Sequence, residues 1–429
     1  MLLYEGAWFL ALLATSPWWL LRSLFDARFR ALCRARSFGK LPPTRAAGAR
    51  TRLLVHCVSV GEVKAARVLL EELGREHELV LSTTTDTGAE LAAKLYPSLA
   101  RVRFPLDWAP FVARFLDGVD PAAVILVELE LWPGFLRACA RRSIPLCVVN
   151  GRISARSFPR YRRLERLLPQ FAGLTLVCAQ DEEYAARFRE LGADPARVQV
   201  TGNIKADGLK CGTLEPRAEI RRLLGARAGQ QLLVAGSTHA PEERWVAEAW
   251  RSAVPEARLV LVPRHPERAA AIAEELGALD LRVQRWSALR DGEVPDPARP
   301  ALVDTIGELE QVYALADLVF VGGSLTPRGG QNMLEPAAQG RAVVYGPELA
   351  NFLQEAALLE RVGASRRLAS AAELGPVFRE LLADAPRRAA MGRAGMLAVE
   401  SQKGAAARTL AALRQHCLDA LPGAAPLPV

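Results

Sequence analysis

Short apolar runs alternate along the chain with segments in which apolar residues recur at helical spacing. The apolar runs predict buried strands at residues 52–60, 78–84, 122–128, 145–150, 173–179, 231–236, 257–263, 316–323 and 341–347. Amphipathic stretches such as 63–73 and 181–193 lie between them. Strands that are buried on both faces are apolar throughout, and parallel strands need a helical crossover. The alternation therefore predicts an α/β fold with parallel sheets.

The pattern is interrupted once near the middle of the chain, where Gly208, Gly212 and Pro216 break the periodicity, and it then restarts. A chain of 429 residues, half of them hydrophobic, is also too long for one ordinary core. We therefore predict two doubly wound domains in tandem. The predicted parts are an N-terminal anchor with a basic segment at 1–40, a first domain at 41–205 and a second domain at 206–429.

The N-terminus has a different character from the rest of the chain. Residues 6–21 carry no charge and include three Trp, and six basic residues follow within residues 22–40. The apolar run approaches the roughly 17 to 25 residues that span a bilayer, and basic residues after it favour a cytoplasmic location for the rest of the chain. A cleaved signal peptide would carry its charges before the apolar run. The pattern favours an uncleaved membrane anchor over a helix packed in the core, and it leaves a span and an in-plane insertion open.

Composition limits the partners without choosing among them. The formal net charge of +8 favours anionic partners, which are nucleic acid, an acidic membrane surface or phosphorylated substrates. The seven Cys include no CxxC pair and the five His are dispersed, so neither a disulfide framework nor a zinc site is indicated. We expect a reducing compartment and no protein-bound metal.

Since doubly wound sheets bind ligands beyond the carboxyl ends of their strands, polar residues there are candidates for chemistry. Glu62 falls in the first turn of a helix, where a carboxylate either complements the helix dipole or acts as a general base that the dipole keeps ionised. Glu128 and Glu130 follow another strand on one side of an extended segment, and they serve either as structural caps or as cleft carboxylates. Lys205, near the domain junction, is either solvated or functional.

In the second half, Arg264, His265 and Arg268 gather three potential cations directly after a strand, where a bound anion would relieve their repulsion. Gly307 and Glu308 begin a helix that leads to the next strand.

The segment 321–347 is rich in glycine. It contains neither G-x-x-x-x-G-K-[ST] nor G-x-G-x-x-G, which disfavours a P-loop nucleotidase and a nicotinamide dehydrogenase. Backbone amides near a helix N-terminus would suit an anion, while Asn332 and Glu335 lie on one helix face and suit sugar hydroxyls. A phosphate cradle and a tight strand-to-helix corner both remain open.

The ordered motifs SVGEV, TTTDTG, ELWPGF, NGRIS, GNIK, GSTH, PRHPER, GEL and GGSLTPRGGQNMLEP resemble the Kdo transferases of lipopolysaccharide biosynthesis over essentially the whole chain. The resemblance implies a GT-B architecture, with two Rossmann-like domains facing a central cleft and an N-terminal apolar helix. It implies an inverting transfer of Kdo from CMP-Kdo to a lipid A precursor, lipid IVA, without a metal or other cofactor. It also implies anchoring at the cytoplasmic face of the inner membrane, with no nucleic acid partner.

The resemblance also implies roles for individual residues. Glu62 would be the general base, and Glu130 and Lys205 would stabilise the transition state. The CMP contacts would be Arg264, His265, Gly307, Glu308, Leu309, Asn332, Met333, Leu334 and Glu335. Gln331 stands where the family commonly has His. The alternatives are a lipid-linked glycosyltransferase or epimerase that uses a UDP-sugar, and a membrane-attached binder of CMP-sugar or lipid without turnover.

Overall fold

The computed structural model describes residues 6, 14–16, 18, 21–22, 24–46, 48–212 and 214–421. Most of the apolar helix predicted at 6–21 lies outside these residues. In the described part of the chain, no helix has both the length and the hydropathy needed to cross a membrane. The chain divides into two compact units: unit 1 runs to Gly208 and resumes at Lys403, and unit 2 is Leu209–Gln402.

Unit 1 is built on a seven-stranded sheet in which all pairs are parallel. Its strands are β1 Arg52–Cys57, β2 Glu78–Thr83, β3 Ala100–Arg103, β4 Ala123–Val127, β5 Leu146–Gly151, β6 Leu176–Ala179 and β7 Val198–Val200, in the order β3-β2-β1-β4-β5-β6-β7. Its helices are α2 Ala27–Phe38, α3 Val60–Ala65, α4 Arg67–Glu76, α5 Asp86–Leu95, α6 Ala109–Val119, α7 Pro133–Arg141, α8 Phe158–Leu167, α9 Glu182–Glu190 and α19 Ala405–His416. Short 3-10 turns lie at Phe171–Gly173, Pro195–Arg197 and Leu418–Ala420.

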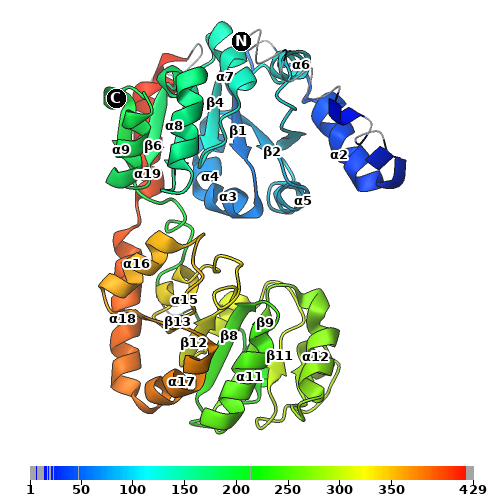
Figure 1. Ribbon diagram of the computed structural model, residues 1–429, viewed down its shortest axis with the longest axis vertical. Helices are drawn as coiled ribbons and strands as arrows, with labels where there is room; N and C mark the ends of the chain where they lie inside the picture. The colour runs from blue at the N-terminus through cyan, green and yellow to red at the C-terminus, as the bar shows by residue number, and fades with distance from the viewer. Residues whose placement is uncertain are drawn as a thin grey trace. The chain divides into compact units, whose positions relative to one another are not determined.

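The end of the chain belongs to unit 1, although the segment after 402 was predicted in the second domain. Leu410 and Leu413 of α19 are buried in the same apolar cluster as Leu176 of β6. Figure 1 shows α19, drawn in red, beside β6. Asp207 accepts hydrogen bonds from the first turn of this helix, so the returning segment is fixed by both apolar packing and a cap.

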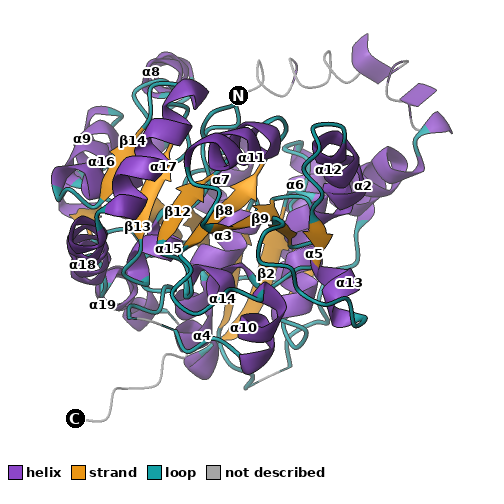
Figure 2. Ribbon diagram, turned by 90° about the horizontal axis from the view of Figure 1, so that it is seen from below, coloured by secondary structure: helices purple, strands orange, loops and turns teal. Residues whose placement is uncertain are grey.

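Unit 2 repeats the architecture with its own seven-stranded parallel sheet. Its strands are β8 Leu232–Thr238, β9 Arg258–Pro263, β10 Gln284–Arg285, β11 Ala301–Leu302, β12 Leu318–Val321, β13 Ala342–Tyr345 and β14 Ser365–Arg367, in the order β10-β11-β9-β8-β12-β13-β14. Its helices are α10 Ala218–Leu224, α11 Glu242–Ala253, α12 Ala269–Gly277, α13 Trp286–Arg290, α14 Leu309–Tyr313, α15 Leu334–Ala338, α16 Leu353–Arg361, α17 Leu374–Ala383 and α18 Ala385–Ser401, with 3-10 turns at Pro266–Arg268 and Ala371–Glu373. Figure 2 shows β13, β12, β8 and β9 in this spatial order.

The predicted α/β fold with parallel strands is confirmed. Each apolar run predicted as a strand contains one, because its Val, Ile and Leu side chains are buried on both faces of a sheet. The prediction missed β3, β7, β10, β11 and β14.

Candidate active site

Several of the candidate residues follow the strands at which the strand order of each sheet reverses. In unit 1 this switch point lies between β1 and β4, and in unit 2 it lies between β8 and β12. Doubly wound sheets bind ligands at such points, beyond the carboxyl ends of the strands. Glu62, Glu128, Glu130, His239 and the glycine-rich loop follow these strands. Lys205 follows β7, Arg264 and His265 follow β9, and the turn at Gly307 follows β11.

Glu62 lies in the first turn of α3, as predicted, and only 8% of its surface is exposed. Its Oε2 accepts a hydrogen bond from the backbone N–H of Val58 at 2.5 Å, and its Oε1 accepts one from the Ser59 hydroxyl at 3.1 Å. Two features of the structure oppose the ionisation that the helix dipole favours. Burial and the nearby carboxylate of Glu128 raise the pKa of Glu62 to about 8, despite the two hydrogen bonds. Glu62 therefore titrates near neutral pH, as a general base should.

Glu128 and Glu130 point to different partners, contrary to the prediction that they share one side. The backbone of Glu128 has a φ of 65°, in the left-handed region, so the alternation of an extended strand ends there. Its Oε1 lies 2.7 Å from the Nζ of Lys205, and both side chains are 22% exposed. Glu128, rather than Glu130, is thus the carboxylate paired with Lys205.

The backbone around Lys205 is held by two amide side chains, of which Asn150 is buried and Asn203 is half-buried. The Oδ1 of Asn150, which is fully buried, accepts a hydrogen bond from the N–H of Ile204 at 3.1 Å. The Oδ1 of Asn203 accepts one from the N–H of Lys205 itself at 3.0 Å. Lys205 is therefore presented from a fixed turn rather than from a solvated linker.

Glu130 is bound to a buried histidine. Its Oε2 lies 2.7 Å from the Nε2 of His56 and accepts a hydrogen bond from Thr84 at 3.2 Å. The Nδ1 of His56 lies 3.1 Å from the hydroxyl of Ser82, its cross-strand neighbour on β2. Burial by itself raises the pKa of Glu130, but His56 and Thr84 outweigh it and lower that pKa. Glu130 thus stays a carboxylate, engaged in a network that links β1, β2 and the end of β4.

In unit 2, four side chains form a cationic cluster, defined here as His239, Arg264, His265 and Arg328. The rings of His239 and His265 are 5.6 Å apart, and burial followed by the charges of His265, Arg328 and Arg264 lowers the pKa of His239. Arg264 and Arg328 are exposed, and among the described residues no carboxylate pairs with either guanidinium. Such a cluster suits an anionic ligand.

The sequence argument did not single out His239, which appears there only within the motif GSTH. Its position directly after β8, at the switch point, was the available signal. His239 also gives Gln331 a partner, because the side-chain Nε2 of Gln331 lies 3.2 Å from the Nε2 of His239. Gln331 thus contacts the cationic cluster as an uncharged neighbour.

The residues after the glycine-rich loop are only partly available to a ligand. Asn332 donates to the Oε1 of Glu335 at 3.2 Å, so the predicted pair on one face is present. The side chains of Met333 and Leu334 are buried in the core of unit 2, which leaves their main chain for any contact with CMP.

Glu308 is committed to protein partners. Its carboxylate pairs with Arg290 and accepts a hydrogen bond from Thr305 at 2.9 Å, and the residue is 4% exposed. Gly307 has a φ of 95°, which glycine adopts without strain, and Leu309 begins α14. The turn therefore offers its backbone, rather than the Glu308 side chain, to a ligand.

Metal ligands do not assemble in the part of the chain that the structure describes, where no group of three His, Cys, Asp or Glu side chains could hold an ion.

Comparisons with known proteins place the chain in a family. The family model described as 3-Deoxy-D-manno-octulosonic-acid transferase (kdotransferase) matches residues 32–208. The 3-deoxy-D-manno-octulosonic acid transferase of Bordetella pertussis is 34% identical over 88% of this chain and 90% of its own length. The transferase of the same name from Haemophilus influenzae is 32% identical over 85% of this chain and 87% of its own length.

Solved structures share the fold at low identity. A glycosyltransferase from Rickettsia africae has a TM-score of 0.57 at 11% identity, covering 85% of this chain and 98% of its own. The UDP-GlcNAc 2-epimerase from Neisseria meningitidis, bound to UDP-GlcNAc, has a TM-score of 0.55 at 11% identity, covering 85% and 100%. These structures support the predicted GT-B type of fold, and the identities of the two transferases decide the family. The chain belongs to the 3-deoxy-D-manno-octulosonic acid (Kdo) transferases and is a glycosyltransferase.

Proposed function

We propose that this enzyme transfers Kdo from CMP-Kdo to a lipid A precursor, lipid IVA, with inversion at the anomeric carbon. The observation that carries the proposal is the group of Glu62, Glu128 and Lys205 at the switch point of unit 1. It combines a buried carboxylate that titrates near neutral pH with a charge pair next to it. A protein that only binds a sugar or a lipid has no need of such a base.

The chemistry follows from these groups. Glu62 takes the proton of the acceptor hydroxyl as the hydroxyl oxygen forms a bond to the anomeric carbon of Kdo. The bond between that carbon and the phosphate oxygen of CMP breaks, and the electron pair leaves with CMP. Lys205, paired with Glu128, is the cation of unit 1 that we assign to transition-state stabilisation. We propose a structural role for Glu130, which stabilises the carboxyl ends of these strands through its contact with His56.

The donor is assigned to unit 2. The guanidinium groups of Arg264 and Arg328 in its cationic cluster carry positive charge that suits a single leaving phosphate. The main chain at Gly307–Leu309 and at Met333–Leu334, with the side chains of Asn332 and Glu335, completes the proposed CMP contacts.

The test is an assay of purified protein in detergent with CMP-Kdo and lipid IVA. We expect release of CMP that requires both substrates and a lipid product heavier by one or more Kdo units. Release of UDP from a UDP-sugar, or no turnover with either donor, would contradict the proposal.

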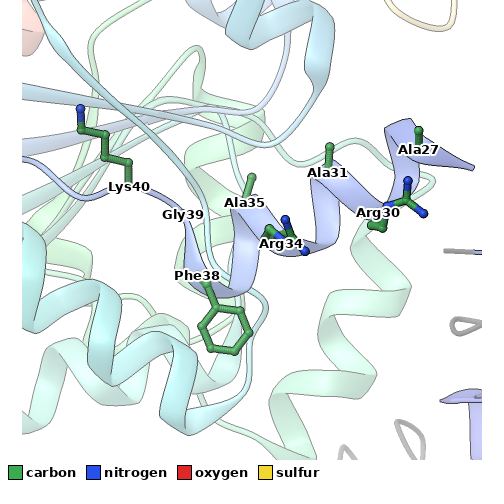
Figure 3. Close-up of a pocket in the computed structure, with 8 residues that line it drawn as sticks. All are labelled: Ala27, Arg30, Ala31, Arg34, Ala35, Phe38, Gly39 and Lys40. Atoms are coloured by element: carbon green, nitrogen blue, oxygen red, sulfur yellow. The ribbon is translucent and has the colours of Figure 1, made fainter. Parts of the chain in front are cut away.

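We further propose that unit 1 meets the cytoplasmic face of the inner membrane through its N-terminal part, including the apolar segment 6–21. Leu24, Phe25 and Phe38 are 70%, 86% and 65% exposed. Arg30 and Arg34 lie on α2 beside a hollow of about 390 Å³ (Figure 3). Exposed apolar side chains next to basic ones are typical of a surface that inserts among anionic lipid headgroups.

Reversing both charges, Arg30→Glu with Arg34→Glu, is expected to weaken binding to vesicles that contain anionic lipid by at least about tenfold, since each basic residue near such a surface contributes about 1 kcal/mol. Co-sedimentation of the variant with these vesicles, at low and at high salt, measures the loss of binding. The matched control is Arg366→Glu with Arg393→Glu, two exposed positions of unit 2. Equal loss in both double variants would contradict a specific role for α2.

A further inference from the structure

The glycine-rich loop after β12 offers its backbone amides to a residue of the protein itself. Glu242, in the first turn of α11, is fully buried. Its Oε2 accepts hydrogen bonds from the N–H groups of His239 at 2.9 Å and Gly323 at 2.7 Å. Its Oε1 accepts them from Ser324 at 3.0 Å and Leu325 at 2.9 Å. The nest of amides, which the sequence left open as a site for a ligand anion, is therefore filled by a side-chain carboxylate.

This position matches that of Glu62 in unit 1. Each residue is a glutamate in the first turn of the helix that follows the first strand at a switch point. Glu62 accepts one backbone N–H and one hydroxyl, whereas four backbone N–H groups saturate Glu242. The same place in the fold thus holds a carboxylate with two donors in unit 1 and a carboxylate with four backbone donors in unit 2.

The carboxylate of Glu242 joins the loops that carry the cationic cluster. Its bond to the His239 N–H fixes the loop after β8, and its bonds to residues 323–325 fix the loop after β12. Gly323 has a φ of 65°, and a Cβ there would lie 3.2 Å from Gln331 and 3.3 Å from His239. The loop therefore packs directly against the pair of side chains at the edge of the cluster.

The connection extends to the loop after β13. The Ser324 hydroxyl accepts a hydrogen bond from the N–H of Gly346 at 2.9 Å, and the Ser324 carbonyl accepts one from Glu348 at 2.9 Å. A Cβ on Gly346 would lie 2.2 Å from the Ser324 carbonyl oxygen, so the two loops are in close contact. One carboxylate thus orders the ends of three neighbouring strands, β8, β12 and β13.

We propose that Glu242 is the positioning residue of the nucleotide site in unit 2: its carboxylate takes the place of a ligand anion in the amide nest and leaves the donor phosphate to His239, Arg264, His265 and Arg328. The inference rests on the proposed donor function of unit 2. It accounts for a glycine-rich loop at a switch point that has no phosphate-binding motif.

The experiment is chemical rescue of Glu242→Ala. The substitution removes the CH₂–COO⁻ group, which acetate can replace. We expect the variant to bind CMP about 10- to 100-fold more weakly than the wild type by calorimetry. Acetate at about 100 mM should strengthen CMP binding by this variant at least fivefold and raise its melting temperature. Sodium chloride at equal ionic strength should change neither quantity. Glu242→Gln keeps the shape of the side chain but turns an NH₂ donor toward backbone N–H donors. It should bind CMP weakly, and acetate should not strengthen that binding.

The matched control is Glu243→Gln, which alters an adjacent carboxylate of equal burial that pairs with Arg268 rather than with amides. It should show no response to acetate.

Wild-type affinity for CMP in both Glu242 variants, or an acetate-independent affinity and melting temperature for Glu242→Ala, would overturn the proposal. If Glu242→Ala folds only with acetate, Glu242→Gln supplies the affinity comparison. If the wild type does not bind CMP, the donor assignment fails, and the acetate response of the melting temperature still tests the nest.

Discussion

Replacing Glu62 by Gln is expected to lower kcat by at least about 100-fold, because the amide cannot accept the proton of the acceptor hydroxyl. The side chain keeps its length, so the hydrogen bond from Ser59 or Val58 to its oxygen can persist and α3 should stay folded. The measurement is CMP release with saturating CMP-Kdo and lipid acceptor. CMP affinity, measured by calorimetry, should be unchanged.

The pH dependence tests the same assignment in the wild type. Burial and Glu128 raise the pKa of Glu62 to about 8, so most molecules carry a protonated, inactive Glu62 at pH 6 to 7. We expect kcat/KM to rise about tenfold per pH unit below this pKa and to level off above it. In Glu62→Gln the residual rate should lack this rise.

Stability gives a second readout of the same residue. The pKa of Glu62 in the folded protein is about 8, above the value of about 4.3 in an unfolded chain. Between these values the folded state holds one more proton than the unfolded state, so this group makes the free energy of unfolding fall as pH rises. Glu62→Gln should remove that fall.

The control is Glu72→Gln, which changes an exposed carboxylate on the neighbouring α4 that pairs with Arg75. It should keep wild-type rates at every pH. A loss of CMP affinity in Glu62→Gln comparable to its loss of rate would instead place Glu62 in the donor site and contradict the base assignment.

The central strands of each sheet could be predicted from sequence because most of their side chains are apolar. β1, β4 and β5 are buried along their whole length and are mostly apolar, with Arg52 and His56 in β1 and Asn150 in β5 as the polar exceptions. The missed strands lie at or next to sheet edges, where one side of the strand meets solvent. β14, with the sequence SRR, and β3, with ARVR, carry polar side chains that no apolar pattern distinguishes from a loop.

The sequence predicted which residues lie at the candidate site, but it did not predict which of them contact one another. Position after a strand identified Glu62, Lys205 and Arg264, since the carboxyl ends of parallel strands meet at one edge. Which carboxylate pairs with Lys205 depends on the left-handed backbone of Glu128, and no local rule predicts that conformation for glutamate. Likewise, the amides of the glycine-rich loop were predicted, but Glu242, their acceptor, is 81 to 83 residues away in sequence.

The second large effect is expected from the charge pair itself. Lys205→Ala should lower kcat/KM by about 100- to 1,000-fold, since it removes the cation that we assign to transition-state stabilisation and leaves Glu128 without its partner. CMP affinity, measured by calorimetry on unliganded protein, should change little. A loss confined to CMP affinity would contradict the assignment of Lys205 to the reaction.

Glu128→Gln separates the two candidate carboxylates. Glu128 is the larger charge contribution to the raised pKa of Glu62, and Glu130 is the smallest one. Removing the charge of Glu128 should therefore lower the pKa of Glu62 and move the midpoint of the kcat/KM profile below pH 8. Glu130→Gln should shift that midpoint less and should instead lower the melting temperature, because the buried Nε2 of His56 loses its carboxylate partner. If Glu130→Gln moves the midpoint further than Glu128→Gln does, Glu130 and not Glu128 is the carboxylate that tunes the base.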